Sequence, residues 1–156
     1  MDERETAIYI FRKLVYLLYL EIGAIQPRNH PQIAEKAKLN TAFFQRDKER
    51  QAVGLYRDTE HETDLNKILA PYEERTGLRL EDIYRAFAEG DWRNKFGAYN
   101  FGGPKWERVA EVTLQLRLAI EQDDAEKIAG LVQEIKKLKT NQGYLINQFD
   151  RTDRRS

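Results

Sequence analysis

The sequence predicts an all-α fold, a single-domain helical bundle of about five to seven helices. Apolar residues recur at helical spacing through most of the chain, and helix caps and stops separate the segments. No alternating apolar and polar run is flanked by hairpin turns. We expect one helical domain over residues 1–149 and a polar tail at 150–156, because 156 residues suffice for one domain.

The first predicted helix spans Glu3–Ile22 and is apolar almost all round over Leu14–Leu20. A surface helix has a single apolar stripe, so this helix belongs either at the centre of the bundle or at an interface. Tyr9, Tyr16 and Tyr19 combine apolar rings with polar tips, a mixture common at interfaces. They predict self-association or partner binding through this helix. The stretch is too short and too charged for a membrane span, so no membrane contact is expected.

The middle of the chain alternates short helices with terminators. A short helix and a longer one are predicted over residues 32–58, with a break between them at 38–40. Thr59 and Glu62 have capping-box spacing at the start of the next helix, which Pro71 should kink and Gly77 should end.

The remaining helices are predicted from apolar spacing and caps. A short helix over residues 78–89 places Leu80, Ile83 and Phe87 on one face. A longer helix over Pro104–Ile120 has an apolar face made of Trp106, Val109, Ala110, Leu114 and Leu118. Asp123 and Glu126 are spaced to cap a last helix over Ala125–Leu138, which the residues TNQG at 140–143 should end.

A long connector rich in glycine and aromatic residues, GDWRNKFGAYNFGGPKWER, occupies residues 90–108 and holds both tryptophans. One interpretation is a compact loop packed by its own aromatic side chains. The other is a binding loop, in which N–H groups at the following helix start and nearby cations hold a phosphate or carboxylate. It matches neither a P-loop nor a dinucleotide fingerprint. The candidate binding residues are Trp92, Arg93, Lys95, Tyr99, Gly102, Gly103 and Lys105.

Residues 32–46, QIAEKAKLNTAFFQR, resemble a helix-turn-helix motif in the spacing of Ile33, Ala34, Ala37, Leu39 and Phe44. Lys38 stands at the turn position, where glycine is common. Two neighbouring helices of any bundle would also produce this spacing. The resemblance implies nucleic-acid contact, with Thr41, Ala42, Gln45 and Arg46 facing the major groove of DNA.

The stretch YRDTEHETD at residues 56–64 is the candidate for metal or acid–base chemistry. On a continuous helix Asp58, His61 and Glu62 would share a face, although a solvated helix start has the same composition. No second histidine lies at ligand spacing, so we expect no metal site. Arg57 and His61, with three residues between them, are similar to the arginine–histidine motif of the HEPN ribonucleases, which are small helical proteins. That resemblance covers two residues and implies RNA cleavage with both groups at one phosphate.

Composition narrows the function further. The 26 basic and 26 acidic side chains balance, so no overall field favours nucleic acid. The chain has no cysteine, which excludes thiol catalysis and fits the cytoplasm, where we expect the protein. No catalytic constellation or cofactor motif is evident. The sequence therefore favours a non-enzymatic helical interaction protein, either a regulator or a subunit of an assembly. The alternatives are a helix-turn-helix DNA-binding regulator and, third, a ribonuclease-like hydrolase using Arg57 and His61.

Overall fold

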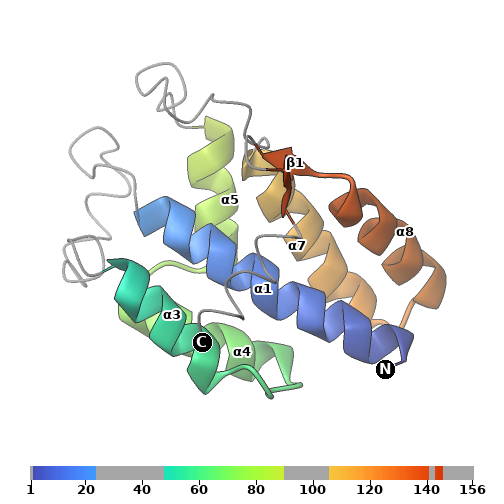
Figure 1. Cartoon of the computed structure of the whole chain (residues 1–156), viewed down its shortest axis with the longest axis horizontal. Coiled ribbons are helices and arrows are strands. Elements are labelled where there is room, and N and C mark those ends of the chain that lie inside the picture. The colour runs from blue at the N-terminus through green and yellow to red at the C-terminus, as the bar shows by residue number, and fades with distance from the viewer. Residues whose placement is uncertain (1, 24–47, 90–105, 141–142, 146–156) are drawn as a thin grey trace.

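Figure 1 shows the computed structural model of the chain, which describes residues 2–23, 48–89, 106–140 and 143–145. Six helices in this part confirm the predicted all-α bundle. They are α1 (Glu3–Gly23), α3 (Lys48–Asp58), α4 (Leu65–Thr76), α5 (Leu80–Glu89), α7 (Trp106–Glu121) and α8 (Ala125–Lys136). Two short strands that were not predicted, β1 (Lys139–Thr140) and β2 (Gly143–Tyr144), pair antiparallel after α8. Thr140 and Gly143 thus belong to this hairpin, and the last helix ends earlier, at Lys136.

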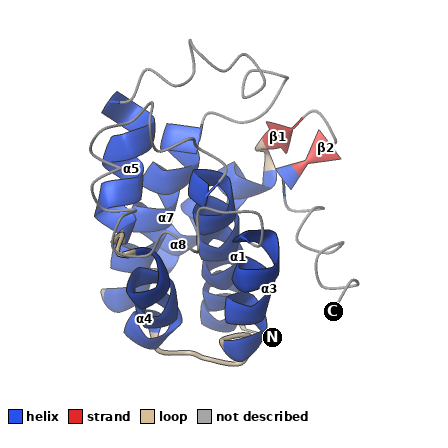
Figure 2. Ribbon diagram, turned by 90° about the vertical axis from the view of Figure 1, so that its left-hand side faces the viewer, coloured by secondary structure: helices blue, strands red, loops and turns tan. Residues whose placement is uncertain are grey.

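Helix α1 is the central element of the bundle. In Figures 1 and 2 it lies between the group α5, α7 and α8 and the pair α3 and α4, and it packs against all five. Every residue over 14–19 is at most 7% exposed. This confirms the first of the two predicted roles, a central helix. Tyr16 and Tyr19 are covered within the chain itself, so they do not form an exposed strip for a partner.

Helix α4 begins later than the predicted capping box. Thr59 does not cap it, because the Thr59 hydroxyl donates to the Leu55 carbonyl at 2.9 Å and so belongs to the end of α3. Asp64 is the N-cap instead, and its carboxylate accepts a hydrogen bond from the Asn66 amide at 2.9 Å. The helix runs on past Pro71 and ends as predicted at Gly77, which has a left-handed φ of 76°.

The N-cap of α8 lies one residue later in the chain than the sequence predicted. Asp123 adopts a left-handed φ of 54° and ends α7, while the Asp124 amide donates to the Ala119 carbonyl at 3.0 Å. This is the Schellman pattern of helix ends. Asp124 then caps α8 by accepting a hydrogen bond from the Lys127 amide at 3.1 Å. Asp123 was predicted to be the cap, and its role in ending α7 explains why the next aspartate takes that position.

The apolar faces were predicted well for α5 and in part for α7. Leu80, Ile83 and Phe87 on α5 are all at most 1% exposed. Trp106 on α7 is half-buried and stacks on Phe87, with 6.2 Å between ring centroids. Leu118 was assigned to the buried face wrongly, since it is 54% exposed. The buried face of α7 is rotated away from Leu118. It consists of Val109, Ala110, Val112, Thr113, Leu116, Ala119 and Ile120.

Candidate functional site

Two of the regions that the sequence singled out lie outside the described residues. The connector residues are Trp92, Arg93, Lys95, Tyr99, Gly102, Gly103 and Lys105, and the helix-turn-helix residues are Thr41, Ala42, Gln45 and Arg46. The binding loop and the DNA-contacting helix therefore stay predictions.

The Arg57–His61 region does not form the helical face that the sequence suggested. Helix α3 ends at Asp58, so His61 and Glu62 lie in the turn before α4 rather than on a shared helix face. The His61 side chain is 94% exposed and lies 3.6 Å from a Glu60 carboxylate oxygen. Arg57 is also exposed, in the last turn of α3. Among the described residues, no group of histidine and carboxylate side chains is arranged to hold a metal ion.

A fully buried cation lies where α1 meets α3. Lys13 has no exposed surface, and its ammonium group lies 4.1 Å from the ring centroid of Tyr56 and 4.9 Å from that of Tyr9. Arg12 beside it donates to the Glu62 carbonyl at 2.7 Å, and burial lowers the pKa of Arg12. Aromatic faces stabilise a desolvated cation. We interpret these contacts as stabilising the α1–α3 interface.

Tyrosines continue this polar core toward α4. The rings of Tyr19 and Tyr72 stack with centroids 5.0 Å apart, and the Tyr19 hydroxyl donates to the Leu78 carbonyl at 2.7 Å. The Tyr72 hydroxyl is buried near the Thr59 hydroxyl, but no group within the described part of the chain meets hydrogen-bond geometry with it, and Thr59 donates its own proton to the Leu55 carbonyl. Burial raises the pKa of Tyr19 and of Tyr72 well above the ordinary value.

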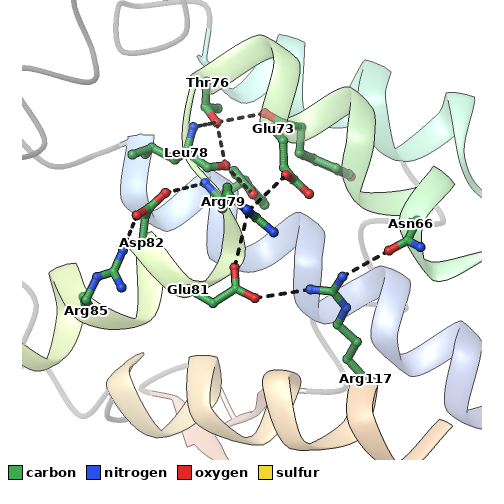
Figure 3. Close-up of polar contacts among 11 residues, drawn as sticks. Asn66, Glu73, Thr76, Leu78, Arg79, Glu81, Asp82, Arg85 and Arg117 are labelled. Carbon is green, nitrogen blue, oxygen red and sulfur yellow. Dashed lines mark hydrogen bonds and ion pairs between the residues drawn. The ribbon is translucent and has the colours of Figure 1, made fainter. Parts of the chain in front are cut away.

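Figure 3 shows a polar network that joins three helices around Arg117 of α7. The Arg117 guanidinium contacts Glu81 of α5 at 3.3 Å and the Asn66 side chain of α4 at 3.0 Å. It also contacts Glu121, one turn further along α7, at 3.1 Å. Each of these contacts satisfies a charged or polar group with another from the same chain. The network therefore fixes how α4, α5 and α7 sit together, and we assign it a structural role.

An open groove of about 500 Å³ lies between α7 and α8. The Leu131 side chain, only 5% exposed, lies among its lining residues, and Gly130 is exposed beside it. A Cβ atom added at Gly130 would have no other atom within 4 Å, so this position leaves room for an approaching group. The described residues that line the groove are Arg108, Gln115, Asp124, Glu126, Lys127, Gly130, Leu131 and Glu134.

One wall of the α7–α8 groove is held by a bidentate ion pair. The Arg108 guanidinium donates two hydrogen bonds to Glu134, each of 2.6 Å, and a third to Glu111. The hydrogen bonds from Glu134 and then Glu111 raise the pKa of Arg108. Two carboxylates thus offset the charge of this arginine and fix its orientation, so the wall is ordered before anything binds.

Comparison of the chain with family models, with curated proteins and with solved structures finds no match in any of the three. Sequence reasoning missed both the buried cation and the α7–α8 groove. Lys13 gave a usable signal, because a lysine inside a helix that is apolar all round has to be buried with it. The Arg108–Glu134 pair spans two helices and has no comparable signal in the sequence.

Proposed function

We propose that this chain is a non-enzymatic interaction protein that binds a protein partner in the α7–α8 groove. The observation that carries the proposal is the open space at Gly130, beside a wall that Arg108 and Glu134 hold in place. A groove that is ordered in advance loses little conformational freedom on binding. We infer that the groove is occupied by a partner protein and that both proteins are in the cytoplasm.

The composition of the groove supports a protein partner. Protein interfaces combine apolar contacts with a charged and polar rim. Here Leu131 lies among polar and charged lining residues, and Leu118 is exposed on α7 one turn beyond the lining residue Gln115. Carboxylates in the lining, Glu126 among them, would repel the phosphates of a nucleic acid. This surface therefore differs from the first-helix interface that the sequence suggested.

Two glycines provide a matched test. Gly130 in α8 and Gly54 in α3 are both inside helices, and a Cβ atom at either position would meet nothing within 4 Å. Gly54 lines a different groove, of about 450 Å³, between α3 and α4. Glutamine at either position should raise the free energy of unfolding by up to about 1 kcal/mol, because it is a better helix former than glycine. Both variants should therefore fold.

The readout is the set of proteins cross-linked to the full chain in a native extract and identified by mass spectrometry. The proposal expects a partner that wild type and Gly54→Gln retain and that Gly130→Gln loses. Equal recovery by all three proteins, or no specific partner with any of them, would show that the groove is not a protein-binding site.

A further inference from the structure

We infer that the α7–α8 groove takes a helical segment of the partner that is cationic at the end nearest the turn over residues 121–126. This rests on the proposed function and adds the chemistry of the partner. Three observations carry it: which carboxylates face the groove, how charge changes along α8, and the shape of the site.

The turn between α7 and α8 exposes four carboxylates, and they divide into two pairs. Glu121 lies 3.1 Å from Arg117, and Asp123 lies 3.3 Å from Arg4, so an arginine accompanies each of them. Asp124 and Glu126 are the two that line the groove. Within the described part of the chain neither forms an ion pair with a cationic side chain. The negative charge of this turn that no cationic side chain pairs with in the described residues therefore lies on the side that faces the groove.

The lining as a whole keeps this sign. Among the described lining residues the cations are Arg108 and Lys127, and Arg108 is already offset by Glu134 within the lining and by Glu111 beside it. Within the described lining, Lys127 is then the cation that remains to offset the charges of Asp124 and Glu126. Complementary potentials attract a partner and set its orientation, so a positively charged segment fits this end of the groove.

Charge reverses toward the other end of α8. Lys136, Lys137 and Lys139 are all exposed there, and the twelve residues of the helix separate them from the acidic turn by about 18 Å. Lys137 follows Gly130 and Glu134 at helical spacing, so it continues the face that borders the groove. A docked segment is thus held in one direction, with its cationic end at the turn.

The shape of the site favours a helix as the occupant. The groove lies between two neighbouring helices that one short turn connects, and a third helix packs into such a groove through its side-chain ridges. Gly130 lets the backbone of that helix come close, and the exposed Leu118 is available to its apolar side chains.

Two synthetic amphipathic peptides of about 15 residues, roughly four helical turns, serve as probes. They share the same apolar positions and carry either lysines or glutamates at the polar positions of one end. Binding to the ¹⁵N-labelled full chain is followed by NMR chemical shifts and by titration at increasing salt. We expect the lysine peptide to shift the amide signals of Gln115, Gly130 and Leu131, and its affinity to fall as salt rises.

Charge-reversal variants complete the test. Glu126→Lys should weaken binding of the lysine peptide about tenfold, because it reverses a charge inside the groove. Asp58→Lys is the matched control: it changes the net charge equally, lines the other groove, and should leave the affinity unchanged. Equal binding of the glutamate peptide, equal effects of the two variants, or preferential binding of duplex DNA to this face would overturn the inference. If the peptides fail while Gly130→Gln still loses the native partner, the proposed function stands and only the cationic segment is wrong.

Discussion

Tyr19 and Tyr72 provide a matched pair for measuring what hydrogen bonds contribute inside this core. Both side chains are fully buried at 0% exposure, their rings stack on each other, and each loses one oxygen when replaced by phenylalanine. The Tyr19 hydroxyl donates to the Leu78 carbonyl, whereas the Tyr72 hydroxyl has no partner within the described residues. We expect Tyr19→Phe to lower the free energy of unfolding by about 1–2 kcal/mol. The Thr76 hydroxyl, 3.4 Å from the same carbonyl, keeps the loss from being larger.

Tyr72→Phe should have the opposite sign. It removes a buried polar group that makes no hydrogen bond, so the free energy of unfolding should stay unchanged or rise by up to about 1 kcal/mol. Urea unfolding followed by circular dichroism measures both variants, and the two midpoints should move apart at an unchanged slope. If Tyr72→Phe is destabilised as much as Tyr19→Phe, the Tyr72 hydroxyl is bonded after all, and the reasoning from its isolation is refuted.

Three further predictions concern the turn, the groove wall and alkaline stability. Asp123→Gly should raise the free energy of unfolding by about 0.5–1 kcal/mol, because glycine adopts the left-handed φ of 54° without strain; a lower melting temperature would contradict this. A double-mutant cycle on Arg108 and Glu134 should give a coupling of at most about 1 kcal/mol, since both side chains are over a third exposed and water screens them. A coupling twice as large would show that the pair is effectively desolvated. Burial raises the pKa of Tyr56 from 10.0 to about 12, so its contribution to stability is complete below pH 10 and is lost as the pH rises through 12. As the pH rises through 12, Tyr56→Phe should therefore lose about 3 kcal/mol less of its free energy of unfolding than wild type loses. Unfolding at successive pH values measures this difference, and a pH profile identical to that of wild type would exclude Tyr56 as the cause.

The sequence predicted those features of the fold that depend on local backbone chemistry or on a repeating apolar pattern. Gly77 ends α4 because a left-handed residue is needed there, and Leu80, Ile83 and Phe87 share a buried face because their spacing matches the helix. The predicted cap at Thr59 was wrong because its hydroxyl donates to carbonyls of the preceding helix, at Leu55 and Tyr56, instead of capping the next one.

The candidate site was much less predictable. The α7–α8 groove depends on which helices become neighbours, and no local pattern reports that choice. Leu118 was mispredicted for the same reason. Its spacing fits the apolar face of α7, but the packing of α5, α8 and α1 determines which residues of that face are buried. Arg108 and Glu134 lie 26 positions apart, so their pairing follows from packing rather than from sequence spacing.

The central position of α1 has a consequence for how the protein is made. Arg4 of α1 donates to the carbonyl of Ile120, 116 positions later in the chain. Ribosomes add about 5–20 residues per second, so α1 waits roughly 6–23 s for the helix that covers one of its sides. During that interval, of the described elements, α3, α4 and α5 are the ones that the apolar residues of α1 can pack against, and the side that α7 and α8 cover in the finished fold stays open. A fragment that stops before α7 retains this bare surface permanently. The apolar side of α1 that α7 and α8 cover is therefore open to aggregation for the time that synthesis of those helices takes.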